Sequence, residues 1–282
     1  WDVYAPEVHL PSVVKAGRVP MKPPARGGES REERLRRQVL APERHLAAFD
    51  LENTLIASNV VASYAWLGSR RLRGRDRARF VAGLVAEAPT LMSLDRKDRS
   101  DFLRYFYRRY EGAPVDQIGH DALEKFSEMI LAKSFPTAIR RVREHRTLGH
   151  RTVLITGALD FVVEPFRPLF DHIVSAELGV VDGAYDGRLT SVPPTGEARY
   201  QALVDHAAQH DLDLRESVAY ADSASDLPML EAVGFPVAVN PETRLAGIAR
   251  KRGWLVEDFR KSPGMHRSPL PLAPTLHSGT SR

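Results

Sequence analysis

Short apolar runs alternate with longer amphipathic stretches over much of this chain. Each apolar run is followed by small or polar residues, as is typical of strands buried on both faces of a parallel sheet. We expect strands at 46–50, 152–156, 172–176, 217–221 and 236–240. The stretches between them predict helices at 137–149, 159–170, 197–210, 226–233 and 242–252. This alternation predicts an α/β fold with a doubly wound, mostly parallel, Rossmann-like sheet.

Three segments do not follow the alternation. Residues 58–134 have helical patterns and no good strand, which predicts a helical subdomain inserted between the first and second strands. Residues 1–44 are rich in Pro and Gly and predict an arm or linker with one short charged helix at 29–40. Residues 262–282 are rich in Pro and Ser and predict a disordered tail. The α/β core then consists of two pieces, 45–57 and 135–261.

The composition excludes several kinds of site. The 282 residues contain no Cys, so disulfides, thiolate metal centres and a Cys nucleophile are excluded. Hydrophobic residues at 43% and charged residues at 27% are ordinary for a globular protein, which excludes a wholly disordered chain. No apolar run approaches the ~18–20 residues that span a bilayer, and no signal peptide is visible, so we expect a cytoplasmic protein. Because the chain begins with Trp1 and not with Met, we expect a piece of a longer protein.

Basic residues are concentrated in one run, which contains Arg70, Arg71, Arg73, Arg75, Arg77 and Arg79. We favour a solvated helix face, because charge runs are common on exposed helices. The alternative is an anionic partner, either a phosphorylated substrate, lipid headgroups or nucleic acid. Aromatic residues follow at 102, 105, 106 and 110, but their spacing fits a buried helix face better than a base-stacking surface.

Polar side chains stand at the ends of three predicted strands. Asp50 ends the first strand, Thr156 and Gly157 end the second, and Asp222 and Asp226 follow the fourth. The carboxyl ends of parallel strands meet at one edge of the sheet, where ligands bind. One Asp at a strand end is often a helix N-cap, but three converging carboxylates repel one another and need a cation. Their hard oxygen ligands suit Mg²⁺.

Together these motifs resemble the haloacid dehalogenase (HAD) superfamily, in its phosphoserine-phosphatase-like branch (subfamily IB) with a helical cap. That family's first motif, D-x-D-x-T, is matched by D-L-E-N-T at 50–54. Its second motif is a Ser or Thr, here Thr156, and its last is D-x-x-x-D, here 222–226. The resemblance covers roughly 45–260 and implies that 58–134 is the cap.

The resemblance also implies a mechanism. Asp50 would attack a phosphoryl group and form an aspartyl-phosphate, which water then hydrolyses. Mg²⁺ would lie between the Asp50 carboxylate, the Glu52 backbone carbonyl and Asp222. The remaining motif residues would bind phosphate (Thr156, Gly157) or support the metal site (Thr54, Asp226).

Three residues depart from the family pattern. Glu52 replaces the second Asp, the general acid and base, and its extra methylene moves the carboxyl group by roughly an ångström, which can cost ~10²-fold in rate. Asn53 replaces a Gly of the turn. Arg199, in P-P-T-G-E-A-R-Y, stands where the family has a Lys; it keeps the charge but not the compact ammonium geometry. The alternative interpretation of Arg199 is a surface residue on an amphipathic helix.

The sequence therefore predicts a Mg²⁺-dependent phosphomonoester hydrolase that acts on a phosphorylated small molecule or a lipid-derived substrate. Two alternatives stay open. One is a degenerate HAD-fold binding or interaction module, which Glu52 and the missing Lys would explain. The other is a HAD domain of a larger lipid-metabolism enzyme, joined through residues 1–44 to an acyltransferase or reductase domain. Nucleic acid is the less favoured partner.

The histidines and two glycines of this chain lead to smaller predictions. The His residues show no metal-binding pattern, so we expect His45, His120, His150 and His172 to be surface or packing residues. Gly183 and Gly187 predict hairpin turns, and the resemblance places a small β-flap there.

Overall fold

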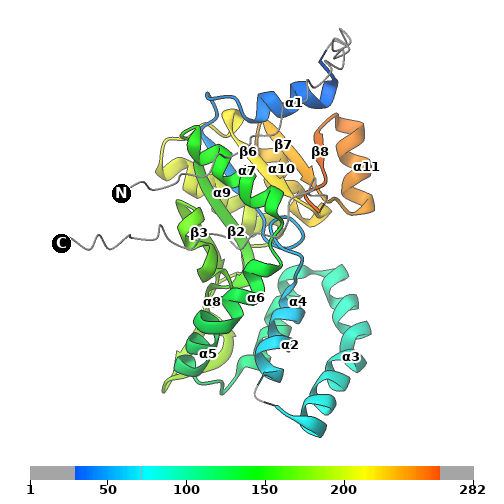
Figure 1. The fold of residues 1–282 in the computed structure, drawn as a ribbon, viewed down its shortest axis with the longest axis vertical. Helices are drawn as coiled ribbons and strands as arrows, with labels where there is room; N and C mark the ends of the chain where they lie inside the picture. The colour runs from blue at the N-terminus through cyan, green and yellow to red at the C-terminus, as the bar shows by residue number, and fades with distance from the viewer. Residues whose placement is uncertain (1–28, 71, 261–282) are drawn as a thin grey trace, which may run out of the picture.

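A six-stranded parallel sheet, in the order β3-β2-β1-β6-β7-β8, forms the centre of the computed structural model, which describes residues 29–70 and 72–260 (Figure 1). The predicted α/β fold with a parallel sheet is confirmed. Its strands are β1 (Leu46–Phe49), β2 (Arg151–Leu159), β3 (His172–Ala176), β6 (Val218–Ala221), β7 (Phe235–Val239) and β8 (Leu255–Glu257).

Helices cover both faces of this sheet, as the apolar runs predicted. In β1, Leu46 and Ala48 pack with residues of α9 (Gly196–Gln209), α10 (Leu227–Ala232) and α11 (Thr243–Arg252). Ala47 and Phe49 point the other way, into a core shared with α7 (Pro136–Thr147). Because successive strand residues face opposite sides of the sheet, a strand that is apolar at every position is buried on both faces.

Two elements differ from the sequence prediction. The predicted helix 159–170 is broken: β2 continues to Leu159, followed by α8 (Asp160–Val163) and a 3₁₀ helix, η3 (Glu164–Leu169). Pro165 and Pro168 explain the break, since each lacks the N–H that an α-helix needs. The edge strand β8 was not predicted.

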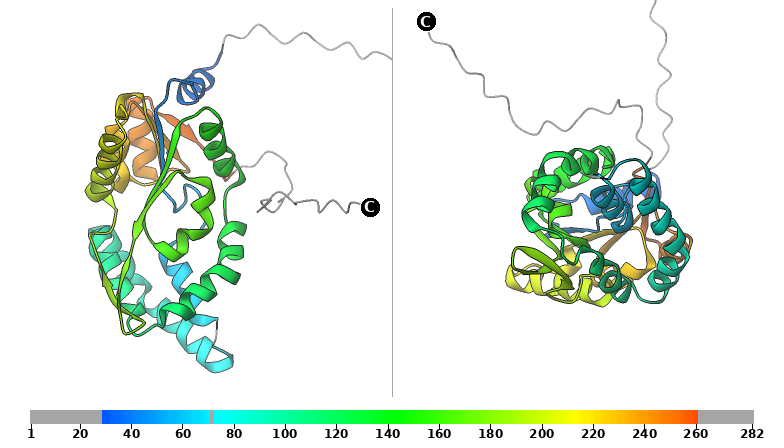
Figure 2. Two further views of the ribbon diagram at one scale, coloured as in Figure 1. Left: turned by 90° about the vertical axis from the view of Figure 1, so that its left-hand side faces the viewer. Right: turned by 90° about the horizontal axis from the view of Figure 1, so that it is seen from below.

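Between β1 and α7, the described residues form helices and no named strand. These are α2 (Val60–Ser69), α3 (Gly74–Lys97), α4 (Arg99–Tyr107), η1 (Arg108–Tyr110), α5 (Val115–Asp121), η2 (Ala122–Phe126) and α6 (Ser127–Ala132). We call residues 60–132 the helical insert; it lies at one end of the elongated molecule (Figures 1 and 2). Its two connections pair, because Ala57 N–H donates to the Lys133 carbonyl (2.9 Å) and Phe135 N–H to the Leu55 carbonyl (2.8 Å).

An antiparallel hairpin, β4 (Leu178–Val181) and β5 (Ala184–Leu189), packs against the helical insert. Gly183, at φ 78°, forms its turn as predicted. Gly187 does not form a turn: it lies inside β5 at φ 71°, where a Cβ atom would stand 2.9 Å from the Arg108 carbonyl oxygen. Close backbone approach, not a turn, therefore explains this glycine.

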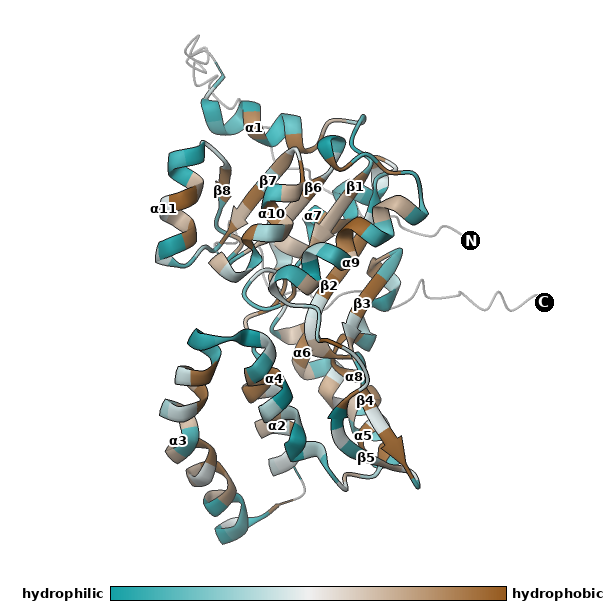
Figure 3. Ribbon diagram, turned by 180° about the vertical axis from the view of Figure 1, so that it is seen from behind, coloured by the Kyte–Doolittle hydropathy of each residue, from teal (hydrophilic) through white to brown (hydrophobic). Residues whose placement is uncertain are grey.

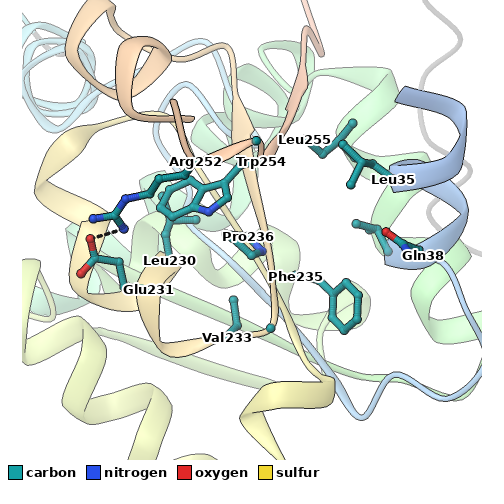
Figure 4. Close-up of a pocket in the computed structure, with 13 residues that line it drawn as sticks. Leu35, Gln38, Leu230, Glu231, Val233, Phe235, Pro236, Arg252, Trp254 and Leu255 are labelled. Carbon is teal, nitrogen blue, oxygen red and sulfur yellow. Dashed lines mark ion pairs between the residues drawn. The ribbon is translucent and has the colours of Figure 1, made fainter. Parts of the chain in front are cut away.

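The short charged helix predicted at 29–40 is present as α1 (Arg31–Val39), capped by Ser30. Its Arg36 Nε lies 2.7 Å from the Glu257 carboxylate of β8, and Val39 is buried. A cavity of about 560 Å³ lies between α1 and the first residues of β7 and β8. Leu35 and Phe235 are among the residues that line it (Figure 4). It lies at the amino edge of the sheet, opposite the predicted site.

The rest of the arm, residues 1–28, and the predicted tail 262–282 lie outside the described residues. Within the described ranges, no helix has the length and apolar character needed to cross a bilayer.

Candidate active site

Asp50 stands directly after β1, at the carboxyl edge of the sheet, and is buried. Its N–H donates to the Tyr220 carbonyl of β6 (3.0 Å), and the Thr54 hydroxyl lies 3.5 Å from its Oδ2. Asn53 adopts φ 52°, a left-handed conformation that Gly takes freely and Asn tolerates. The Asn240 side chain donates to the Asn53 carbonyl (2.5 Å). Asn53, which stands where the family has Gly, can therefore form the same turn.

The three predicted carboxylates converge at this edge. One oxygen from each of Asp50, Asp222 and Asp226 lies within 4.8 Å of the other two. Burial raises the pKa of Asp222, and repulsion from Asp50 and Asp226 raises it further, against a hydrogen bond from the Asn53 side chain. A hard divalent cation relieves such repulsion, so this donor set fits Mg²⁺.

Arg199 supplies a fixed positive charge to these carboxylates. Its Nη1 lies 2.8 Å from Asp50 Oδ1 and also donates to Asp226 Oδ1. Burial alone would lower the pKa of Arg199, but Asp226 and Asp50 outweigh it and raise the pKa. With 5% of its surface exposed, Arg199 is not the surface residue of the alternative interpretation.

A second arginine, Arg99, approaches from the helical insert. It is the first residue of α4 and forms an ion pair with Glu52. Its Nη1 also lies 2.7 Å from Asp95 Oδ1. Burial raises the pKa of Glu52, Arg99 opposes that shift, and Asp50 adds to it. Arg99 was not predicted, because it stands in a charged stretch with no motif of its own. Only the fold brings it to Glu52.

Thr156 and Gly157 lie in the last part of β2, next to β1. Thr156 is buried, and its hydroxyl oxygen accepts from Ala158 N–H (3.1 Å). The Gly157 carbonyl accepts from the Tyr107 hydroxyl of α4 (2.8 Å). A Cβ atom on Gly157 would stand 2.6 Å from Leu103 Cδ1 and 2.8 Å from Thr195 Cγ2. Gly157 therefore lets α4 and the start of α9 approach the same strand.

We expect Gly157→Ala to lower kcat/KM by about 10- to 100-fold. The added methyl group would push away Thr195, which precedes the helix that carries Arg199, and displacements near an ångström have costs of this size. Steady-state kinetics on a soluble phosphate ester would measure the effect. Gly247→Ala on α11 is the matched control, since a Cβ atom there meets nothing within 4 Å. Unchanged kinetics in Gly157→Ala would contradict the packing argument.

Glu242 is a further residue that the sequence analysis did not single out. Its carboxylate accepts from Ala224 N–H (2.8 Å), and its own N–H donates to the Asp222 carbonyl (2.9 Å). Glu242 thus contacts the segment between Asp222 and Asp226 at its first residue and at its middle. It is the N-cap residue of α11 but makes no side-chain capping hydrogen bond there, and no motif marks it in the sequence.

The four named His residues lie away from the acidic site, on the surface or in packing contacts. His150 is buried against His145, His120 faces Glu124, and His45 accepts from the Asp213 N–H. His172 stacks on His206. Among residues 29–70 and 72–260, the three carboxylates are the one group of potential ligands spaced for a metal ion.

A small cavity of about 10 Å³ lies beside Glu52, between β2 and the helical insert. Tyr107, Tyr110 and Val60 are among the residues that line it. Pockets for small ligands usually measure ~300–1,000 Å³, so this cavity is too small for a substrate.

A parallel sheet with carboxylates and a buried cation at its carboxyl edge places the protein among the α/β proteins that bind ligands there. The chain belongs to the haloacid dehalogenase-like hydrolase family, whose model matches residues 47–231.

Named relatives and a solved structure agree with this assignment. Phosphoserine phosphatase SerB1 of Mycobacterium tuberculosis is 29% identical, over 82% of this chain and 76% of that protein. Histidinol-phosphatase of Neisseria meningitidis is 28% identical, over 77% of this chain and 100% of that protein. The crystal structure of a Bordetella pertussis protein of unknown function superposes with a TM-score of 0.66 at 27% identity, covering 77% of this chain and 99% of that one. The phosphoserine-phosphatase-like branch, predicted from the motifs, is confirmed, and the relatives support a phosphatase.

Proposed function

We propose that this chain is a Mg²⁺-dependent phosphomonoester hydrolase that works through an aspartyl-phosphate on Asp50. The observation that carries the proposal is the buried cluster in which Arg199 bridges Asp50 and Asp226, with Asp222 beside them. Asp50, the Glu52 backbone carbonyl and Asp222 would hold the ion, and Asp226 would support the site. When bound, Mg²⁺ would shield the negative charge of the phosphoryl group.

The chain's own residues then account for the transfer. An Asp50 carboxylate oxygen forms a bond to phosphorus while the ester P–O bond breaks. Arg199 holds Asp50 in position and offsets the charge that the phosphoryl group adds. The leaving oxygen takes a proton from Glu52, and Glu52 then accepts a proton from the water that hydrolyses the aspartyl-phosphate. Thr156 would donate its hydroxyl proton to a phosphoryl oxygen.

The environment of Glu52 suits this double role. Burial raises its pKa, which favours a protonated acid, while the Arg99 ion pair favours the carboxylate. Because Arg99 belongs to the helical insert, movement of the insert would break the pair and open the small cavity. We therefore propose that the helical insert is the cap, which admits substrate when it moves away and excludes water when it returns.

The proposed substrate is a phosphorylated small molecule or a lipid-derived phosphomonoester. Relatives named for phosphoserine and for histidinol support a small phosphomonoester. The proposed setting is the cytoplasm, and residues 1–44 remain the proposed link to a further domain. A degenerate binding module is the competing proposal, and the intact geometry around Asp50 and Arg199 favours the enzyme over it.

Phosphate release from a broad panel of phosphomonoesters, with Mg²⁺ and with EDTA, tests the proposal. We expect release that requires Mg²⁺. If no compound releases phosphate while the folded protein still binds Mg²⁺, the degenerate-module proposal replaces this one.

We expect Glu52→Asp to preserve kcat or to raise it by up to about 10-fold. The shorter side chain restores the usual acid of the motif. It also weakens the ion pair with Arg99, so that the carboxyl group donates its proton to the leaving oxygen more readily. Glu52→Gln is the matched control and should lose about 10²-fold or more, because an amide cannot exchange the proton. Equal activity of Glu52→Gln and the parent would show that Glu52 is not the acid.

A further inference from the structure

The outer face of α3 lacks the charge that an exposed helix normally carries. Leu91 is the one buried residue of this 24-residue helix. On its exposed face, Val81, Val85 and Met92 are 43%, 67% and 55% exposed. Their spacing of four and seven residues places them on one side of the helix. We call these three residues, with the exposed Pro89 between them, the α3 stripe.

Basic side chains stand at both ends of the α3 stripe. Arg77 is four residues before Val81, and Arg96 is four residues after Met92, so both extend the same face. Arg75 and Lys97 flank them, and all four are exposed. Figure 3 shows hydrophilic colour gathered at the two ends of α3, which is an outer element of the insert.

The acidic residues near the stripe do not neutralise these four cations. The acids of α3 are ion-paired elsewhere: Asp76 with Arg79 (3.5 Å), Glu87 with Arg109, and Asp95 with Arg99 (2.7 Å). Within the described part of the chain, Arg75, Arg77, Arg96 and Lys97 form no ion pair. The α3 stripe thus has apolar side chains in its middle and basic side chains without ion pairs at both ends. This pattern is complementary to a partner whose surface is anionic and whose interior is apolar.

We propose that the α3 stripe lies on an anionic lipid surface, with Val81, Val85 and Met92 at the boundary of headgroups and acyl chains and Arg77 and Arg96 on lipid phosphates. A second copy of the chain fits less well, because both ends of the stripe are basic. Two stripes would place like charges together in either orientation.

The depth of binding is set by Pro89. Proline has no N–H, so the Val85 carbonyl lacks its usual helical donor four residues on, and an unpaired carbonyl is costly in hydrocarbon. At headgroup depth water can bond to it. The helix is therefore suited to lie in the interface and not to cross the bilayer, in line with its many charges.

The experiment is sedimentation of the full chain with phosphatidylcholine vesicles, with and without phosphatidylglycerol. We expect binding only when phosphatidylglycerol is present, and release at about 0.5 M salt. Arg77→Gln/Arg96→Gln should weaken the partition coefficient by about 30-fold, from the usual worth of two basic residues near such a surface. Val85→Glu should weaken it by about 10-fold or more.

Matched controls keep the test specific. Arg244→Gln/Arg250→Gln on exposed α11 and Val180→Glu on exposed β4 change the same chemistry elsewhere, and neither should alter binding. Hydrolysis of a soluble phosphate ester should be unchanged in every variant, so a failure here is distinct from failure of the proposed function.

Three results would overturn the lipid proposal. The first is no sedimentation with anionic vesicles at low salt, including the case in which the chain binds duplex DNA instead. The second is a concentration-dependent dimer that Val85→Glu abolishes. The third is equal vesicle binding by the α3 variants and the parent.

Discussion

Asp50→Asn should lower kcat by about 10⁴-fold or more, the range typical for removal of a catalytic nucleophile. An amide oxygen is a far weaker nucleophile than a carboxylate, and Asp50 is the carboxylate that lies next to both Thr54 and Arg199. The loss should appear in kcat for every substrate of the panel, because the nucleophile takes part whatever the leaving group is.

The same substitution should not unfold the protein. Asp50 and Asp226 are buried and Asp222 is half-buried, the three carboxylates repel one another, and the charge of Asp50 helps to raise the pKa of Asp222. Its loss relieves repulsion but also removes one partner of Arg199, so we expect a thermal midpoint within a few degrees of the parent's. Asp205→Asn, on the exposed side of α9, is the control and should keep full activity.

Trapping the intermediate separates a nucleophile from a purely structural Asp50. A stopped reaction of the parent should contain acid-stable, hydroxylamine-labile phosphate on the protein, and Asp50→Asn should contain none. Labelled phosphate on the variant, or hydrolysis at the parental rate, would show that another group attacks phosphorus.

The α/β core could be predicted because its strands are buried on both faces. Runs such as Leu46–Phe49 are apolar at every position, and their ends fix where the polar residues meet. Asp50 and Asp222, which the structure brings together, were singled out for this reason, whereas Thr156 lies inside β2 and not at its end. The strand β8 was missed because three residues carry too little pattern, and its place depends on pairing with β7.

The parts that could not be predicted depend on contacts between distant segments. Arg99 meets Glu52 only because the insert folds back over the sheet, and Glu242 holds the Asp222 loop across a turn between elements. Gly187 was read as a turn because glycine signals turns, whereas the neighbouring Arg108 backbone is what requires it. In each case the cause lies in a residue far along the chain.

The charge balance of the site leads to a second large expected effect, at Arg199. Arg199→Ala should lower kcat by about 10³-fold, because Asp50 loses the donor that orients it and the incoming phosphate loses a cation. It should also lower the free energy of unfolding by about 3 kcal/mol without Mg²⁺, since it leaves buried carboxylates uncompensated. Chemical denaturation in EDTA would measure that change.

Arg199→Lys is the informative partner of this variant. A Lys stands at this position in the family pattern, so we expect kcat within about 10-fold of the parent. An ammonium group keeps the charge but reaches Asp50 and Asp226 from one point, without the fixed planar geometry of guanidinium. If Arg199→Lys were as inactive as Arg199→Ala, the fixed geometry of Arg199, and not its charge, would be what the reaction requires.

Magnesium titration distinguishes this role from simple packing. Arg199 neutralises Asp50 and Asp226, and a bound divalent cation would do the same. The stabilisation that either cation gives is therefore larger when the other is absent. Arg199→Ala should therefore gain more thermal stability from Mg²⁺ than the parent does, although it turns over more slowly. A residue that only filled space would leave the Mg²⁺ dependence unchanged, and parental stabilisation by Mg²⁺ in Arg199→Ala would contradict the shared neutralisation of these carboxylates.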